Sequence, residues 1–536
     1  MFRNIIAKYV LVIFLVLFSP VFLFAQDTNL TLLCVAAHPD DEDGATLAYY
    51  SLIKGYKAYT VFYTRGEGGQ NEIGPELDSA LGRIREQECY DAAKIQGSTP
   101  YFLGFLDFGY SKTAKETFKF WGGKDSVLKR IVYMIRMLRP DVVITNHDTI
   151  TTKPNRQHGN HQAAGITIYE AFDKAADPTY HPEQLVNGVE PWQIKKLYFR
   201  VFDTTKTGDF VTINVNQSTP DGRTIGEIAF EALSQHRTQG MDKLTPETAP
   251  WAFGNRRYML VRSDKDYPYD KDNLFSGLHP HETSPFVSEL KSFPTKYHYF
   301  FLNPSDSLAI LKSLKVSHDV YVGLVKSYDI TTENTLKAFN IKFDTLSTQM
   351  LASSDLKKYS VIILDIRAYL YRKDLAEYND RILDFVKGGG NVICFYQKPQ
   401  DWNGNDYAPY PIYITTQRVT EEDAPVTMLM SDDWLFNRPN HIGLGDWSGW
   451  VQERNIYLPS GDTALTSPKY KRMLAMSDED DPVPPTSLLW AEYGVGTYTY
   501  CSLALYRQLK IFNEGALKLF LNMVSQPRRM IKGKYN

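Results

Sequence analysis

An apolar run leads directly into a polar cluster at Leu32-Leu33-Cys34-Val35-Ala36-Ala37-His38-Pro39-Asp40-Asp41-Glu42. Consecutive apolar residues without alternation are typical of a parallel strand that is buried on both faces. In open α/β sheets, ligands and catalytic groups collect at the carboxyl ends of the strands. The sequence therefore predicts an α/β fold with a functional site directly after this strand.

The acids in this cluster also have a structural interpretation. Acidic residues favour a helix N-terminus, and residues 44–50 have a helical composition. Capping explains one or two acids, but it leaves His38 and Pro39 unexplained. A second polar cluster, His158-Gly159-Asn160-His161, follows another apolar strand at residues 141–147. Because polar clusters at two strand ends can converge on one ion, we favour a metal site.

The residue types in the two clusters suit zinc. Catalytic Zn²⁺ typically takes three protein ligands from His and Asp or Glu and leaves one position open for water. His38 and Asp41 are three residues apart and can face one point from a single turn. His158 and His161 have the same spacing at the start of a predicted helix over 162–169, so both rings are expected on one face.

The first motif resembles the signature of the LmbE/PIG-L family of zinc-dependent N-acetyl-sugar deacetylases, in which a strand is followed by Ala-His-Pro-Asp-Asp-Glu. The resemblance covers residues 29–265. It implies that His38, Asp41 and His161 bind the metal. It also implies that Asp40 is the general base and that His158 stabilises the oxyanion.

Two further features bear on this resemblance. Arg85, with Glu88 one turn later, matches a family element whose arginine faces the substrate; the alternative is an ordinary surface pair. Asn160 stands where family members usually carry an Asp between the two histidines. An Asn can orient His158, but it cannot stabilise a protonated imidazole as a carboxylate would, so activity or its pH optimum is expected to be altered.

The expected reaction is hydrolysis of an N-acetyl group on an amino sugar or glycoconjugate. Bound Zn²⁺ can lower the pKa of water from ~15.7 to about 7, and Asp40 would take the proton of that water and deliver it to the departing amine. Two alternatives stay open. One is a non-catalytic glycan-binding protein that retains the metal site, and the other is a zinc amidohydrolase that acts on a different acyl-amide substrate.

Length and charge set the frame around the site. A chain of 536 residues predicts two to four domains. With 59 basic and 62 acidic residues the chain has no polycationic character, so nucleic acid is not an expected partner. The oligomeric state is not predicted.

The N-terminus has the pattern of a Sec-type signal peptide over residues 1–25. Arg3 and Lys8 precede an apolar run over residues 10–18, and the small residue Ala25 stands where cleavage is expected. An uncleaved anchor is the alternative, which Pro20 disfavours by interrupting the run. The sequence predicts a periplasmic or secreted protein without stable membrane insertion after cleavage, since no later apolar run is long enough to span a bilayer.

Strands and helices alternate along the first half of the chain. The predicted strands cover 32–37, 59–64, 101–106 and 141–146, and the predicted helices cover 44–54, 79–95 and 124–138. This alternation indicates βαβ units and a Rossmann-like parallel sheet. We expect this deacetylase-like domain to span residues 29–265 and a linker to span residues 266–300.

A second α/β domain is expected over residues 301–530. Its predicted strands cover 320–325, 361–366 and 391–396, and its predicted helices cover 308–315, 332–339 and 374–387. The order resembles the flavodoxin-like outline of class I glutamine amidotransferases. Those enzymes place a cysteine on a sharp turn after a strand, whereas Cys394 lies inside a predicted strand. We therefore expect a non-catalytic domain, with a carbohydrate-binding or docking role.

Some residues are expected to be structural. The four cysteines (Cys34, Cys89, Cys394 and Cys501) are predicted to be buried free thiols, and not a disulfide framework. His236 is expected to cap a helix or lie on the surface, with a place in the pocket lining as the alternative. His279 and His281 have no evident partners for metal binding. The acidic run over residues 477–482 is interpreted as a solvated loop, with Ca²⁺ binding as the weaker alternative.

Overall fold

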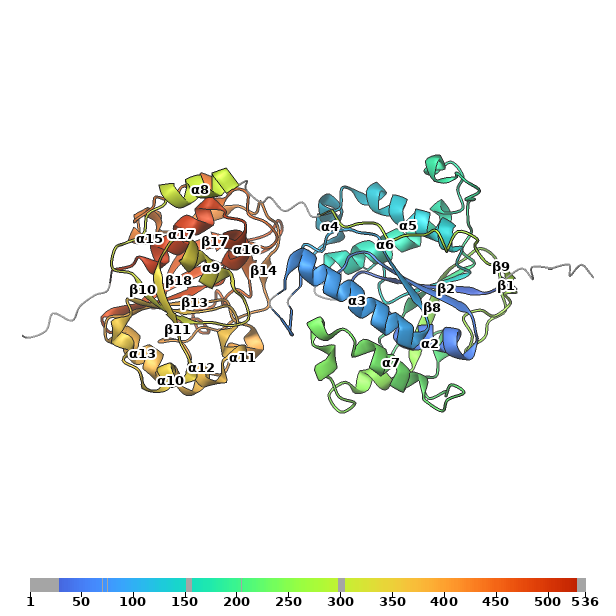
Figure 1. Cartoon of the computed structure of the whole chain (residues 1–536), viewed down its shortest axis with the longest axis horizontal. Coiled ribbons are helices and arrows are strands. Elements are labelled where there is room, and N and C mark those ends of the chain that lie inside the picture. The colour runs from blue at the N-terminus through green and yellow to red at the C-terminus, as the bar shows by residue number, and fades with distance from the viewer. Residues whose placement is uncertain are drawn as a thin grey trace, which may run out of the picture.

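The computed structural model describes residues 28–69, 71–74, 76–150, 157–203, 205–296 and 304–527. Two lobes lie side by side, one made of residues 28–296 and the other of residues 304–527 (Figure 1). The predicted signal peptide, residues 1–25, lies outside the described residues. Within the described ranges, every helix is too short or too polar to traverse a lipid bilayer.

The N-terminal lobe is built on a seven-stranded sheet with the order β4-β3-β2-β5-β6-β8-β7. The strands are β2 (Thr31–Ala36), β3 (Lys57–Phe62), β4 (Thr99–Phe102), β5 (Val142–Thr145), β6 (Lys196–Arg200), β7 (Phe210–Ile213) and β8 (Arg256–Ser263). Strands β2 to β6 are parallel, and β8 pairs antiparallel with β6 and β7. In chain order the parallel strands run 3-2-1-4-5, which is the Rossmann arrangement. The predicted Rossmann-like sheet is confirmed.

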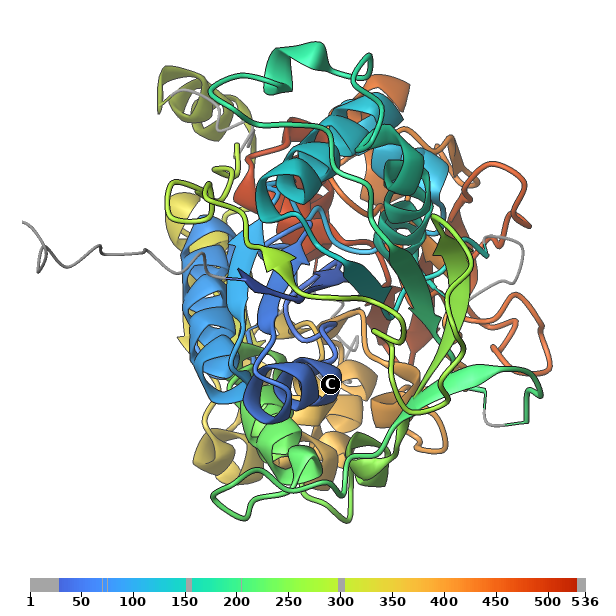
Figure 2. The same cartoon turned by 90° about the vertical axis from the view of Figure 1, so that its right-hand side faces the viewer.

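Helices cover both faces of this sheet (Figure 2). One face carries α2 (Gly44–Ala48), α3 (Asp78–Gln96) and α7 (Ile225–Leu233), and the other carries α4 (Ala114–Phe120), α5 (Lys124–Leu138) and α6 (Gly159–Lys174). On β2, Leu33 and Val35 pack into the core under α5 and α6, while Leu32 and Cys34 pack under α2 and α7. Burial on both sides explains why the strand is apolar throughout, since each buried Leu or Val contributes about 1.5–3 kcal/mol.

Residues 266–296 belong to the N-terminal lobe. Strand β9 (His281–Glu282) pairs with β1 (Thr28–Asn29), and Phe275 is buried in the core under α2. The Phe293 N–H donates to the Phe102 carbonyl at 2.8 Å, at the end of β4. The predicted linker over 266–300 is therefore wrong as far as residue 296, because apolar residues scattered among its prolines and aspartates find places in the core.

The C-terminal lobe has an eight-stranded sheet with the order β11-β10-β12-β13-β19-β18-β17-β15. The strands are β10 (Tyr321–Val325), β11 (Lys342–Thr345), β12 (Val361–Leu364), β13 (Asn391–Phe395), β15 (Val426–Met428), β17 (Lys471–Met476), β18 (Leu488–Tyr493) and β19 (Gly496–Cys501). The first five strands of the order are parallel, and the other three are joined antiparallel. In chain order the parallel strands run 2-1-3-4-5, which is the flavodoxin-like order.

The helices of this lobe are more numerous than the three predicted from the sequence. They include α8 (Pro304–Ser313), α9 (Thr331–Ala338), α10 (Thr348–Ser353), α11 (Ala368–Tyr371), α15 (Trp434–Asn437), α16 (Leu505–Lys510) and α17 (Glu514–Val524). The predicted helix over 374–387 is two helices, α12 (Lys373–Glu377) and α13 (Asn379–Lys387), which meet at Tyr378. All four cysteines are buried and unpaired, as predicted. Burial raises the pKa of the Cys394 thiol in β13 to about 12, which makes it a poor nucleophile.

Candidate metal centre and active site

The two polar clusters predicted from the sequence meet at one edge of the N-terminal sheet. His38 follows β2, and the adjacent parallel strand β5 leads to His147. Helix α6 begins at Gly159, with His158 as its N-cap residue, and carries His161 in its first turn. The strand order reverses between β2 and β5, and such a switch point is where ligands bind in open α/β sheets.

Asp41 is the centre of this cluster. Its Oδ2 atom lies 3.1 Å from His38 Nδ1 and 3.2 Å from His161 Nε2. Burial alone would raise the pKa of Asp41, but the charge of His161 and the hydrogen bonds to both histidines hold it well below its ordinary value. Asp41 Oδ2 therefore lies within hydrogen-bonding distance of both imidazoles.

His147 also lies in the cluster, although it was not predicted as a site residue. Its Nε2 atom is 3.7 Å from Asp41 Oδ2, and it forms a possible metal-binding group with Asp41 and His161. A second such group contains His38, His158 and His161. The Ala37 N–H donates to His147 Nε2 at 3.0 Å, so that nitrogen is already engaged. His147 is therefore better suited to positioning the loop after β2. The sequence feature that could have identified it is its place at the end of β5.

Asp40 has an unusual backbone. Its φ is +82°, in the left-handed region that residues with a Cβ rarely adopt, and such strain clusters at functional sites. Its carboxyl group lines the cavities beside the metal centre. Burial and the adjacent charge of Asp41 raise the pKa of Asp40 to about 7. Asp40, next to Asp41 in the chain, therefore lines the cavities beside the cluster.

The last two acids of the motif are structural. Glu42 lies 2.9 Å from Nε2 of His236, which is fully buried, so the prediction of a surface or capping histidine is wrong. Asp43 caps α2 by accepting the Thr46 N–H at 3.1 Å, and Arg200 lies 2.6 Å from its other oxygen. The capping interpretation therefore holds for Asp43, while Asp40 and Asp41 remain free for chemistry.

Asn160 contacts a different histidine from the one expected. Its Nδ2 atom lies 3.1 Å from His38 Nε2, while its Oδ1 atom accepts hydrogen bonds from Thr117 at 2.9 Å and Ser111 at 3.3 Å. No described residue hydrogen-bonds the buried Nδ1 atom of His158. Burial lowers the pKa of His158 well below its ordinary value, so its imidazole is neutral. Asn160 therefore orients His38, and His158 keeps an unused ring nitrogen beside the metal centre.

Arg85 is buried at the cavity wall and is not part of a surface pair. Its Nε donates to Thr238 Oγ1 at 3.2 Å, and its Nη1 donates to the Gly66 carbonyl. Glu88 is also buried and accepts from the Thr238 N–H at 2.9 Å and from its hydroxyl at 2.7 Å. The surface-pair alternative is therefore wrong. That Arg85 contacts the substrate stays a prediction.

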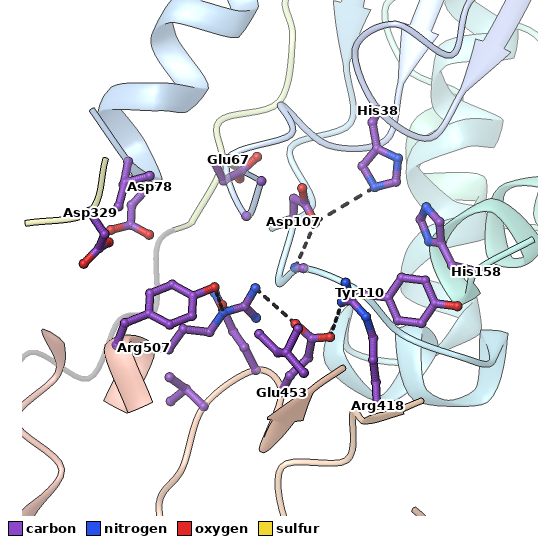
Figure 3. A pocket seen from close by; sticks show the side chains of 18 of the residues that line it. His38, Glu67, Asp78, Asp107, Tyr110, His158, Asp329, Arg418, Glu453 and Arg507 are labelled. Atoms are coloured by element: carbon purple, nitrogen blue, oxygen red, sulfur yellow. Dashed lines mark hydrogen bonds and ion pairs between the residues drawn. The ribbon is translucent and has the colours of Figure 1, made fainter. Parts of the chain in front are cut away.

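The metal centre opens into a cavity of about 470 Å³ between the two lobes (Figure 3). The N-terminal wall includes Asp40, Asp41, His158, Glu67, Asp107 and Tyr110. The C-terminal wall includes Arg367, Lys398, Arg418, Glu453, Tyr457 and Arg507. In Figure 3 the His38 and His158 rings lie across the cavity from Arg507 and Glu453. This shared cavity was not predicted, because no local pattern relates residues about 300 positions apart.

A second cavity, of about 920 Å³, reaches the same centre from within the N-terminal lobe. It shares Asp40, Asp41 and His161 with the first cavity, and its walls include the exposed side chains of Phe202 and Trp251. The reactive carboxylates are therefore accessible from two sides. Both sides present a mixture of polar and apolar surface.

The acidic run over 477–482 holds the lobes together. Asp478 is buried, lies 2.7 Å from Lys112 Nζ of the N-terminal lobe, and accepts the Thr420 N–H at 2.8 Å. The prediction of a solvated loop is therefore wrong for this residue, because the charge is neutralised from the other lobe. His281 lies 2.8 Å from Asp141 and forms no metal-binding group among the described residues.

The fold is thus a Rossmann-like sheet with a histidine and carboxylate cluster at its switch point, where open α/β sheets bind ligands. The family described as PIG-L, GlcNAc-PI de-N-acetylase, matches residues 33–172. The chain belongs to the PIG-L family, and it is a hydrolytic N-deacetylase.

The curated relatives agree with this assignment. The chain is 30% identical over 296 residues to 1D-myo-inositol 2-acetamido-2-deoxy-α-D-glucopyranoside deacetylase 1 of Frankia alni, covering 46% of this chain and 99% of that one. It is 29% identical over 282 residues to deacetylase 2 of the same description from Saccharopolyspora erythraea, with coverages of 46% and 99%. N,N′-diacetylchitobiose deacetylase from Pyrococcus horikoshii is 19% identical, with a TM-score of 0.33 and coverages of 44% and 84%.

Proposed function

We propose that this protein is an exported, zinc-dependent deacetylase that hydrolyses the N-acetyl group of an N-acetylglucosamine unit in a sugar or glycoconjugate. The observation that carries the proposal is the contact of Asp41 Oδ2 with both His38 and His161, beside the free carboxyl group of Asp40. The substrate class is supported by the similar deacetylases, whose names specify acetamido sugars.

The donor set fits zinc. Histidine and carboxylate are the ligand types of a three-ligand catalytic site, Asp41 Oδ2 contacts both His38 and His161, and the unpartnered nitrogen of His158 lies beside them. His38, Asp41 and His161 would hold the ion. Bound zinc supplies Lewis acidity, which polarises a carbonyl oxygen and acidifies water.

The protein groups then have distinct tasks. Asp40 accepts a proton from the water whose oxygen adds to the acetyl carbon, and it gives that proton to the amine nitrogen as the C–N bond breaks. Acetate and the free amino sugar are the products. The neutral imidazole of His158 donates a hydrogen bond to the oxyanion that forms at the carbonyl oxygen.

Amine release tests this function directly. Zinc-loaded full-length protein should release amine and acetate in equal amounts from N-acetylglucosamine conjugates, and removal of the metal should abolish the release. Full metal occupancy without release from any N-acetylated sugar would contradict the proposal. Export is tested separately, because N-terminal sequencing of mature protein outside the cytoplasm should find a start near Gln26.

A further inference from the structure

The C-terminal lobe presents the ligand-binding edge of its own sheet to the active-site cavity. Cavity residues follow four of its parallel strands at their carboxyl ends: Tyr328 and Asp329 after β10, Arg367 after β12, Lys398 after β13, and Arg507 after β19. In flavodoxin-like sheets this edge is where ligands bind. The metal centre lies at the corresponding edge of the N-terminal sheet. Two ligand-binding edges therefore enclose one cavity.

The two walls of the cavity carry opposite charge. The charged residues of the N-terminal wall are Asp40, Asp41, Glu67, Asp78, Asp107 and Arg85. Those of the C-terminal wall are Arg367, Lys398, Arg418, Arg507, Lys510, Asp329 and Glu453. Acids thus dominate beside the metal centre, and bases dominate on the opposite wall. A ligand that spans the cavity meets a cation-binding region at one end and a basic region at the other.

Part of this basic wall is already neutralised within the protein. The Arg418 guanidinium pairs with the buried Glu453 and donates to the Tyr457 hydroxyl at 2.9 Å. Lys510 pairs with Asp78 of the N-terminal lobe. The first two contacts lie within the C-terminal lobe and the third joins the two lobes, so Arg418 and Lys510 are already paired within the protein.

Arg507 also lies 3.2 Å from Glu453, and Arg367 lies 3.8 Å from Glu72, but each of these arginines keeps one donor without a partner in the described part of the chain. The Nε atom of Arg367 and the Nη1 atom of Arg507 are buried, and neither has a hydrogen-bond partner among the described residues. Lys398 is half-buried, and within the described ranges it forms no hydrogen bond or ion pair. Burial and the neighbouring charge of Arg367 lower the pKa of Lys398. Polar donors in folded proteins are normally satisfied by protein, water or a ligand, so these groups leave hydrogen-bonding capacity on the basic wall.

We infer that the C-terminal lobe provides an anion subsite, formed by Arg367, Lys398 and Arg507, for a carboxylate or phosphate carried by the substrate next to its N-acetylated sugar. The preferred substrate is then an acidic N-acetylglucosamine conjugate and not a neutral chitin fragment. This inference rests on the proposed deacetylase function. A cavity of about 470 Å³ is within the range that binds drug-sized ligands, so both parts of such a substrate can be enclosed.

Matched substrates separate the two kinds of anion. We would compare kcat/KM of the zinc-loaded full chain for neutral N,N′-diacetylchitobiose, for a disaccharide of N-acetylglucosamine with a uronic acid, and for N-acetylglucosamine 1-phosphate. The kcat/KM of at least one acidic substrate should exceed that of the neutral one by tenfold or more. The acidic substrate with the higher value shows whether the subsite binds a carboxylate or a phosphate. Equal values in all three arms would overturn the inference.

Lys398→Gln is the sharpest variant, because removing this amine leaves no partner unsatisfied. It should reduce the preference for the acidic substrate at least fivefold, mainly through KM, and Lys398→Arg should restore most of that preference. Lys373→Gln makes the same charge change at an exposed position of the same lobe and should leave the preference intact. If the two Gln variants behave alike, Lys398 does not bind the substrate.

Binding measurements keep this inference separate from the proposed reaction. Calorimetric titration of the full chain with glucuronate and with inorganic phosphate should show binding of at least one of them that Lys398→Gln weakens and Lys373→Gln does not. If no substrate is deacetylated but this binding is seen, the reaction fails and the subsite stands. If the acidic and neutral substrates react equally and neither anion binds, the subsite fails and the reaction stands.

Discussion

The guanidinium carbon of Arg418 lies 4.6 Å from the centroid of the Tyr110 ring, although the two residues belong to different lobes. The Tyr457 ring lies 4.7 Å away on the same guanidinium, and the Tyr110 ring is 5.6 Å from the ring of His158. Cation–π contacts of this kind are worth about 0.5–2 kcal/mol each. The position of the C-terminal lobe is therefore linked by direct contacts to a histidine of the metal centre.

Replacing Arg418 should destabilise the protein and weaken the link between the lobes. Arg418→Gln leaves the fully buried Glu453 with only Arg507, 3.2 Å away, to compensate its charge. We expect a loss of roughly 3 kcal/mol, the lower end for breaking a buried ion pair. The loss in the free energy of unfolding is measured by urea unfolding of the wild type and the variant. Arg83→Gln, at an exposed position, is the control. Equal stability of the two variants would show that the Arg418–Glu453 pair does not stabilise the protein.

Replacing Asp41 should remove the metal and the activity together. Asp41→Ala deletes the oxygen that contacts both His38 and His161, and leaves His38 with the more distant carboxylate of Asp107, 3.9 Å away. Elemental analysis should find zinc well below one equivalent, and deacetylation should fall to background. The role of Asp41 as a ligand is refuted if the variant keeps both full zinc and activity.

Replacing Asp40 should separate metal binding from turnover. Asp40→Asn keeps the size of the side chain but cannot accept a proton, and the loss of a general base costs on the order of 10²–10⁴ in rate. Zinc content should stay near that of the wild type while kcat falls. Asp380→Asn, at an exposed position of the C-terminal lobe, is the control for the chemical change. Loss of zinc from the Asp40 variant would mean that this residue is a ligand.

Asn160 should act through His38. Asn160→Ala removes the amide beside His38 Nε2 and leaves the hydroxyls of Thr117 and Ser111 without their shared acceptor. Groups that orient a metal ligand typically contribute 10–100-fold in metal affinity or activity. Zinc competition titration should show a loss in this range, and Asn160→Asp, which keeps the acceptor, should lose less. An unchanged zinc affinity would show that Asn160 does not orient His38.

Glu67 should make the stability of the protein fall as the pH rises. Burial and the nearby charge of Asp107 raise its pKa to about 8 in the folded state, from about 4.5 when unfolded. Between these values the folded state holds a proton that the unfolded state has released, so the free energy of unfolding decreases with pH.

Glu67→Gln should remove this dependence. Urea unfolding between pH 5 and pH 8 should show a decline for the wild type that is larger, by up to a few kcal/mol, than the decline for the variant. Glu289→Gln, at an exposed position, should decline as the wild type does. Parallel declines for the wild type and Glu67→Gln would show that Glu67 does not carry the effect.

Much of the architecture was predictable because it depends on local patterns. A strand buried on both faces must be apolar at every position, so the run before His38 identified β2, and alternation with helices identified the Rossmann-like and flavodoxin-like sheets. The motif beginning at His38 is short and contiguous, so its residues lie together in any fold that starts a helix at that strand end. Cys394 was recognised as a strand residue by the same reasoning.

What the sequence by itself determined, therefore, was the two α/β sheets and the candidate residues at the ends of their strands. Tertiary structure alone decided the partners of those residues: Asn160 with His38, His236 with Glu42, and Asp478 with Lys112. It also brought Arg418 against Tyr110 and closed a charged cavity between the lobes. The physical reason is that buried polar groups must find partners, and those partners come from distant chain segments whose approach no local periodicity records.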